Sequence, residues 1–194
     1  YLIILDNFES TSINSNIWTK FGENYGDITI NNNECVITNT SGGDDDVIGI
    51  ATQYKFGVNT YIKARVKNIS GRHSALIGFG ESTYRPYPHA RSGIGCTWYS
   101  RADALSSNTS LKDENGTTEY GTPATQDLTS YQELILWRES ESIIKIYRDG
   151  TLEQTFNNKL FSNNYSFYFS ADGHTKPNTI KIDSVVIKRG NPFN

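Results

Sequence analysis

Hydrophobic and polar residues alternate with a period of two along most of the chain. Alternation of this kind is typical of half-buried strands, and clusters of Gly, Asn and Asp separate the alternating runs. Strands are therefore expected near residues 1–8, 27–30, 34–39, 46–54, 58–68, 74–81, 92–99, 131–139, 142–148, 151–156, 165–171 and 178–188. No run shows the 3.6-residue period of an amphipathic helix, so the pattern predicts an all-β domain.

Three stretches add detail to this prediction. The run "NTYIKARVKN" is expected to be a half-buried antiparallel strand, with Ile62, Ala64 and Val66 on one face and, on the other, Tyr61, Lys63, Arg65 and Lys67. The sequence "RDGT" at 148–151 predicts a two-residue hairpin, because glycine adopts positive φ at little cost. Residues 102–130 lack the alternation and are expected to form a long polar loop.

Length and composition narrow the class of protein. The 194 residues suit one domain, 1–194, with a substantial core. A hydrophobic content of 36%, with twelve Tyr and nine Phe, favours sheets with polar loops over a helical bundle. The net charge of -3, with both signs scattered, leaves no basic stripe and argues against nucleic acid as a partner. No apolar run approaches the roughly 20 residues that span a bilayer.

Other features point to the extracellular space. The chain contains no Met, which suggests a cleaved leader or excision from a longer product. Five N-x-[ST] sequons are candidate glycosylation sites, at a number that chance alone nearly supplies: Asn39, Asn68, Asn108, Asn115 and Asn164. Cys35 and Cys96 are expected either to form one disulfide or to remain two buried free thiols, since their spacing indicates no metal site.

Segments spread along the chain resemble one known superfamily. They are "ILDNFESTSINSNIWTKFG", "QYKFGVNTYIKARVKNISGRHSALIGFGE", "YQELILWRESESIIKIYRDGTLEQTF" and "NTIKIDSVVIKR". In this order they are similar to motifs of the concanavalin A-like lectin/glucanase jelly roll, in particular its laminarinase-like and LamG-like branches. The resemblance covers nearly residues 1–190. It implies a single-domain β-sandwich of two antiparallel sheets, one concave and one convex, with ligands usually held on the concave face.

The catalytic motif of that superfamily is missing. Its glycosidases carry E-x-D-x-E on one concave strand, where alternate residues share a face and two Glu flank one glycosidic bond. The counterpart here, "SGIGCTWYSR", contains no acid. Glu139 and Glu141 are interpreted as solvated turn charges, and the acids at 44–46 lie in a Gly-led loop. His89, Arg91 and Tyr99 are residue types that a polysaccharide lyase uses, but the ordered lyase motifs are absent. The sequence therefore predicts that the chain is not an enzyme.

The segment "GFGESTYRPYPHARSGIGCTWYSR" is the candidate carbohydrate-binding site. Flat aromatic rings and forked Arg donors match the C–H faces and hydroxyls of sugars. Either Trp98 is buried, which leaves Tyr99 and Arg101 exposed, or Trp98 is itself an exposed platform. The alternative is that Pro86 and Pro88 merely stiffen a loop whose tyrosines pack on the sheet edge. The candidate contacts are Tyr84, Tyr87, His89, Arg91, Trp98, Tyr99 and Arg101.

The resemblance also implies structural roles. Trp18 and Trp137 fall on motif positions that are usually core or edge packing. Many members hold a structural Ca²⁺ through the Asp of the closing strand and carbonyls of an early Gly-containing loop. Asp183 matches that Asp, and Gly42 and Gly43 could supply the carbonyls.

The leading functional hypothesis is an extracellular, non-catalytic domain that binds carbohydrate, in the manner of a lectin or adhesion module. A second hypothesis is a structural subunit of a filament, coat or virion fibre. In that case the apolar N-terminal "YLIIL" would complete a neighbour's sheet, whereas otherwise it pairs within its own sandwich. A third hypothesis is an atypical polysaccharide lyase or glycosidase.

Overall fold

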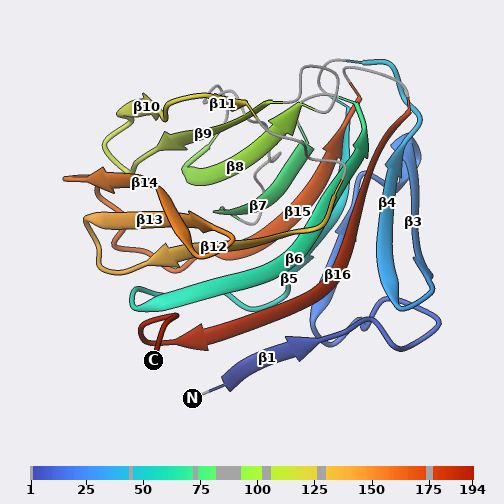
Figure 1. Cartoon of the computed structure of the whole chain (residues 1–194), viewed down its shortest axis with the longest axis horizontal. Coiled ribbons are helices and arrows are strands. Elements are labelled where there is room, and N and C mark those ends of the chain that lie inside the picture. Colours follow the sequence, from blue (N-terminus) through green and yellow to red (C-terminus); the bar gives the residue numbers. More distant parts are fainter. Residues whose placement is uncertain are drawn as a thin grey trace.

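The computed structural model describes residues 2–43, 46–71, 74–81, 93–101, 106–125, 130–173 and 177–194. These residues form two eight-stranded antiparallel sheets that make a β-sandwich, as the alternation predicts (Figure 1). Apart from the strands, the described residues include one short 3-10 helix, η1 (Glu23–Tyr25). No helix among them is long and apolar enough to cross a membrane.

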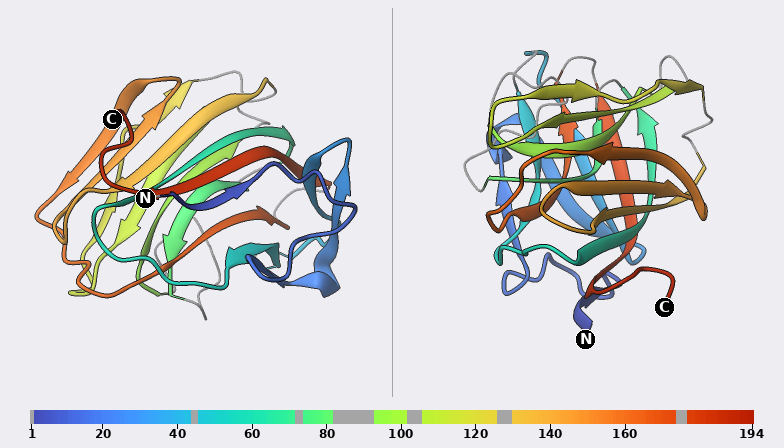
Figure 2. Two further views of the ribbon diagram at one scale, coloured as in Figure 1. Left: turned by 90° about the horizontal axis from the view of Figure 1, so that it is seen from below. Right: turned by 90° about the vertical axis from the view of Figure 1, so that its left-hand side faces the viewer.

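Sheet A contains, in spatial order, β14 (Thr151–Asn157), β13 (Ile143–Arg148), β12 (Gln132–Arg138), β6 (Thr60–Ser70), β16 (Asn178–Arg189), β4 (Glu34–Asn39) and β3 (Gly26–Asn31), with β1 (Leu2–Asp6) beside β16. Sheet B contains β10 (Thr118–Tyr120), β9 (Ser106–Lys112), β8 (Gly95–Arg101), β7 (Ser74–Gly80), β15 (Ser166–Asp172), β5 (Val47–Thr52) and β2 (Trp18–Phe21), with β11 (Ala124–Thr125) beside β9. The two termini lie at the same end of the molecule (Figures 1 and 2).

The hydrophobic core lies between the sheets and follows the sequence alternation. In β6, Ile62, Ala64 and Val66 point inward and are buried, while Lys63 and Arg65 point outward. Strand β15 of sheet B contributes aromatic rings to the same core. Removal of this apolar surface from water is the main favourable term in folding. The alternation predicted for residues 61–67 is therefore confirmed.

The predicted hairpin is also confirmed. Asp149 and Gly150 connect β13 to β14 with positive φ angles of 46° and 79°. Two successive positive φ values twist the chain in the sense that antiparallel strands require. The Asp149 carboxylate also accepts a hydrogen bond from the backbone N–H of Glu133, at 2.9 Å, which fixes the turn against β12.

The prediction of a long loop over residues 102–130 is wrong in part. Three strands, β9, β10 and β11, lie in this segment at the edge of sheet B. β9 pairs with β8 over its whole length, yet its inward face presents Ser107 and Thr109 before Leu111. Because the interior at this edge is polar, the strand lacks the apolar alternation that would have marked it. The sequence pattern also missed β2.

The apolar N-terminus pairs within its own sandwich. Leu2 to Asp6 run antiparallel to the second half of β16, whose first half pairs with β4. β1 and β4 thus pair with successive halves of β16. Of the two pairings considered for this segment, the structure shows the internal one.

The two tryptophans at motif positions have different surroundings. Trp18 lies in the main core beside Phe169, and its Nε1 donates to Asp6 Oδ2 at 2.7 Å. Trp137 lies on the outer face of sheet A, in a small cluster with Tyr61 and Ile135. Both are buried, which agrees with structural packing.

One end of the sandwich is held by polar contacts. Arg138 of β12 is fully buried and donates to the backbone carbonyls of Phe56, Phe161 and Asn163. Beside it, the Glu114 carboxylate accepts hydrogen bonds from the connection between β14 and β15. We call Arg138, Glu114 and their partners the end clamp.

The cysteines are two buried free thiols, so the disulfide alternative is excluded. Cys35 lies on β4, which packs against β5 and β15, whereas Cys96 lies on β8, which packs against β6. The two cysteines therefore belong to different sheets and to strands that do not face each other. A disulfide requires Cα atoms only about 4.4–6.8 Å apart.

Burial should make both thiols unreactive in the folded protein. Desolvation raises the pKa of Cys35 to about 12, with a further contribution from Asp6, and burial alone raises the pKa of Cys96. Since the thiolate is the reactive form, we expect no reaction with Ellman's reagent at about pH 8. Two thiols per chain should react after unfolding in urea. A thiol that reacts in the native state, or none after unfolding, would contradict this arrangement.

Glu114 should make stability depend on acidic pH. Burial alone would raise the pKa of its carboxyl, but hydrogen bonds from Ser162, Tyr165 and Asn163 outweigh burial and lower the pKa to about 2. The folded-state pKa lies below the ordinary value of 4.5, so this stabilisation is present above pH 4.5 and is lost as the pH falls towards 2. We expect Glu114→Gln to reduce the loss of unfolding free energy between neutral and acidic pH, measured by urea unfolding.

Glu141→Gln is the matched control, because Glu141 is exposed in the turn between β12 and β13. This variant should keep the wild-type pH dependence. Identical pH profiles for Glu114→Gln and the wild type would show that the carboxylate of Glu114 does not act in this way.

Candidate functional site

Strand β8 carries the sequence-predicted site, and its side chains alternate across sheet B. Cys96 and Trp98 point into the core. By the same alternation, Thr97 and Tyr99 point to the outer face. Tyr99 is only 6% exposed there, so the expectation that burial of Trp98 leaves Tyr99 exposed is wrong. Trp98 exposes only 1% of its surface, so it is an interior residue and not the exposed platform that the sequence also allowed.

The outer face of sheet B presents two cross-strand rows, which follow from the strand register. The first row is Thr19, Ala51, Tyr168, Gly78, Thr97, Ser110 and Tyr120. The second row is Phe21, Gly49, Ser170, Ala75, Tyr99 and Asn108. We call these two sets the outer rows. Rings, hydroxyls and very small residues alternate along both of them.

The small residues give the rings room to lie against the backbone. A Cβ atom on Gly78 would lie 2.5 Å from Cζ of Tyr168, so this ring lies directly over Gly78. It reaches across β7, and its hydroxyl forms a hydrogen bond with Thr97 on β8. In the second row, a Cβ atom on Gly49 would lie 2.5 Å from Cζ of Phe21. Aromatic rings placed over strand glycines restore packing that glycine alone cannot provide.

The outer rows contain no acid. Among the described strand residues that point outward from sheet B, the carboxylate is that of Asp172, at the end of β15 and 1% exposed. The outward positions of β8 are Gly95, Thr97 and Tyr99, and the strand contains no acid. Paired carboxylates on this strand are therefore not available for general acid–base work.

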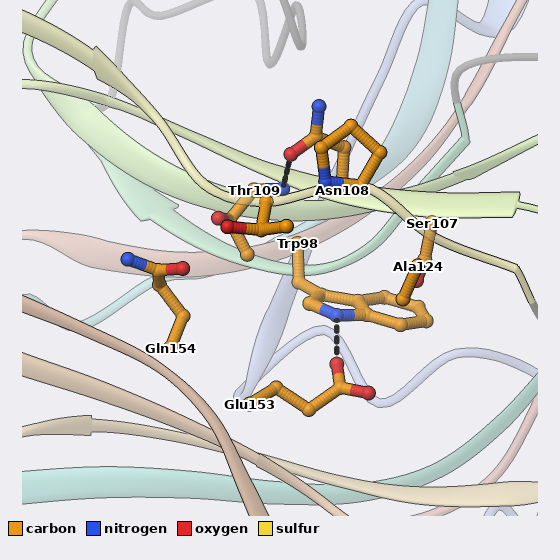
Figure 3. A pocket seen from close by; sticks show the side chains of 9 residues that line it. Trp98, Ser107, Asn108, Thr109, Ala124, Glu153 and Gln154 are labelled. Atoms are coloured by element: carbon orange, nitrogen blue, oxygen red, sulfur yellow. Dashed lines mark hydrogen bonds between the residues drawn. The ribbon is translucent and has the colours of Figure 1, made fainter.

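A pocket of about 250 Å³ opens at the edge of the sandwich where β9 and β11 face β14 (Figure 3). It is lined by Trp98, Ser107, Asn108, Thr109, Thr122, Pro123, Ala124, Glu153 and Gln154. Nε1 of Trp98 donates to Oε2 of Glu153 at 2.9 Å, and Arg148 forms an ion pair with the same carboxylate. The lining combines one aromatic ring with hydroxyl, amide and carboxylate groups.

The structure places the remaining predicted site residues as follows. Tyr84, Tyr87, His89 and Arg91 lie outside the described residues, as does the side chain of Arg101. Glu139 forms an ion pair with Lys145, with Nζ and Oε2 2.8 Å apart, at the turn between β12 and β13. Glu141 lies in the same turn and is exposed, which agrees with its interpretation as a turn charge.

The residues proposed for calcium are not brought together. Asp183 forms an ion pair with Arg65 at 2.9 Å. Gly42 and Gly43 lie beyond the opposite end of β4, because Asn39 pairs with the first residue of β16. Five residues of β16 separate that end from Asp183, about 17 Å at 3.3 Å per residue. Among the described residues, no three His, Cys, Asp or Glu side chains form a metal-binding cluster.

Two of the five sequons are excluded by burial. Asn39 and Asn68 are fully buried, and their side-chain amides donate hydrogen bonds inside the sandwich. An amide in that position leaves no room for a glycan in the folded protein. Asn115 and Asn164 are exposed in loops, and Asn108 is partly exposed on β9.

Sequence reasoning missed the pocket and its residues on β14. The strand reads "TLEQTFN", in which Glu153 and Gln154 are adjacent polar residues that break the period of two. The pairing of β13 with β14 shifts register between Ile146 and Tyr147, and Glu153 is the additional residue. Adjacent polar residues directly after a two-residue hairpin were the available signal for an irregular edge strand.

Comparison with solved structures supports the fold. No protein-family model and no curated protein matches the chain. Solved structures match over nearly its whole length. One, from work on endo-acting O-glycanases of human gut bacteria that initiate mucin breakdown, has a TM-score of 0.74 and 10% identity over 98% of this chain and 100% of that one.

Two glucanase structures are similar to the same extent. A lichenase from a mouse hindgut metagenome has a TM-score of 0.72 and 12% identity, over 96% of this chain and 98% of that one. The laminarinase catalytic domain of Thermotoga petrophila has a TM-score of 0.70 and 13% identity, over 98% of both chains.

These matches correct one prediction. The sequence predicts that the chain is not an enzyme because the E-x-D-x-E motif is missing. That prediction is contradicted, because the structures that share this fold along their length are enzymes that act on glycans. At 10–13% identity the likeness establishes architecture and not the reaction. The chain has the fold of the concanavalin A-like glucanase superfamily, as its sequence motifs indicated.

Proposed function

We propose that this chain is an extracellular carbohydrate-active domain that binds a glycan along the outer rows of sheet B. The supporting observation is the fold, which several glycan-cleaving enzymes share over almost their entire length. The arrangement of side chains on β8 and its neighbours gives this proposal a specific surface.

The outer rows have the chemistry that neutral sugars require. A sugar ring has an apolar C–H face and a rim of hydroxyls, so it is bound by an aromatic ring next to hydrogen-bonding groups. Tyr99 lies one row from Tyr168, and the hydroxyls of Thr97, Ser110 and Ser170 lie between and beside them. The glycines between the rings let Tyr168 and Phe21 lie flat against the sheet.

Acid–base chemistry on this face must use a different arrangement from that of the similar enzymes. β8 offers no carboxylate at the outward positions Gly95, Thr97 and Tyr99. Asp172 is the acid that the described strands of this face provide, and it is 1% exposed at the end of β15. We therefore include Asp172 in the test of catalysis.

The test uses the purified domain and a panel of laminarin, mixed-linkage β-glucan, porphyran and mucin glycans. Binding is measured by titration calorimetry, and cleavage by release of reducing ends. We expect binding to at least one glycan, weakened about tenfold or more by Tyr99→Ala through loss of ring stacking. Tyr54→Ala is the matched control, because Tyr54 is 60% exposed and lies outside the outer rows. This variant should bind like the wild type.

The results of these assays distinguish a domain that cleaves glycans from one that only binds them. Product release that Asp172→Asn abolishes, with binding retained, would assign the acid. Binding without product would define a glycan-binding domain on the same face. A folded protein that neither binds nor cleaves any member of the panel, or binding unaffected by Tyr99→Ala, would overturn the proposed surface.

A further inference from the structure

The interior of the sandwich is not apolar throughout. In its middle, the sheets enclose aliphatic and aromatic side chains. At the edge where β9 and β11 of sheet B face β14 of sheet A, the inward positions are Ser107, Thr109 and Gln154. Buried polar side chains cost free energy unless they are hydrogen-bonded, so their concentration at the pocket needs an explanation.

One of these groups lacks a partner. Thr109 is 4% exposed, and within the described part of the chain its Oγ1 has no hydrogen-bond partner. It lies close to the backbone of Gly121, where a Cβ atom would lie 1.8 Å from this oxygen and 2.9 Å from Oε1 of Gln154. Glycine at 121 thus allows a hydroxyl and an amide to lie together on one wall of the pocket.

The other wall of the pocket contains the Trp98 ring and the Glu153 carboxylate, and the negative charge of Glu153 is already paired. Figure 3 shows the indole of Trp98 between Glu153 on one side and Thr109 and Asn108 on the other. The Glu153 carboxylate receives the indole N–H and is paired with Arg148. A cation would compete with Arg148 for this carboxylate, and an anion would be repelled by it. The pocket therefore favours a neutral ligand.

We propose that this pocket, which we call the edge pocket, binds one neutral sugar ring or a polyol of similar size. Pro123 and Ala124 offer apolar contact to the C–H face beside the buried Trp98 ring, while Thr109 and Gln154 hydrogen-bond the hydroxyls. The volume of about 250 Å³ is smaller than the roughly 300–1,000 Å³ of sites for drug-sized ligands, so one ring fits and an oligosaccharide does not. The edge pocket does not depend on the proposed function, because Trp98 faces inward from sheet B and Tyr99 faces outward.

The test is a two-dimensional NMR titration of the whole chain with glucose, galactose, N-acetylglucosamine and inositol, each up to about 50 mM, which detects millimolar dissociation constants. We expect at least one of them to shift the indole N–H resonance of Trp98 and the amides of Thr109, Ala124 and Gln154. Thr109→Val, which removes the hydroxyl at nearly constant shape, should weaken binding about tenfold. Thr155→Val is the matched control on the opposite face of β14.

A second variant keeps the test decisive if Thr109→Val unfolds the edge. Ala124 lines the pocket from β11 and is only partly buried, so Ala124→Leu fills the space without disturbing the core. This variant should abolish the shifts. Shifts that persist in Ala124→Leu, or no shift with any probe in a folded wild type, would overturn the edge pocket. Shifts confined to residues of the outer rows would also overturn it, while leaving the proposed glycan surface intact.

Discussion

The buried guanidinium of Arg138 is the interaction on which the closed end of the sandwich depends. It lies between the rings of Phe79 and Tyr165, with Cζ 5.1 and 4.9 Å from their centroids. Its nitrogens bond three backbone carbonyls, so segments from both sheets converge on one cation. Burial lowers the pKa of Arg138 to about 10, which leaves it charged at neutral pH. The Glu114 carboxylate, bonded to the hydroxyl of Tyr165, supplies the compensating negative charge nearby. Loss of either Arg138 or Glu114 would leave the other charge buried without its counter-charge, so the two residues stabilise the fold together.

The end clamp also positions the surfaces proposed for binding. Phe56 and Tyr165 exchange backbone hydrogen bonds directly before β15, and this fixes the register of the strand that carries Tyr168. Glu114 lies in the turn between β9 and β10, so the same contacts hold the strand that lines the edge pocket. A single polar cluster therefore orients an outward-facing aromatic surface and an inward-facing polar cavity. Their chemistry differs because sheet B presents opposite residues to its two sides.

The sequence predicts the apolar part of this fold and misses the polar part, for one physical reason. Alternation reports whether a strand separates water from a hydrocarbon core, as in β4, β6 and β13, and those strands were predicted. β9 separates an outer face with Asn108 and Ser110 from a polar interior with Ser107 and Thr109, so no alternation marks it. The interior orientation of Trp98 remained open because Thr97 and Tyr99 suit either face. The register that places Tyr168 over Gly78 depends on contacts between strands far apart in sequence, which no local pattern contains.

The missing acids on β8 restrict how this fold can act on a glycan. Retaining glycosidases need two carboxyl groups about 5–5.5 Å apart and inverting ones about 6.5–9.5 Å, and alternate positions of one strand provide such spacings directly. In this chain the outward positions of β8 hold Gly95, Thr97 and Tyr99, none of which is a carboxylate. Bond cleavage on this face would have to draw its acid from another strand, such as Asp172 on β15. One cross-strand position, Ala75 on β7, separates Tyr99 on β8 from Ser170 on β15 in the outer rows. Catalysis in this chain, where it occurs, must then use a geometry unlike the single-strand pair that the fold permits elsewhere.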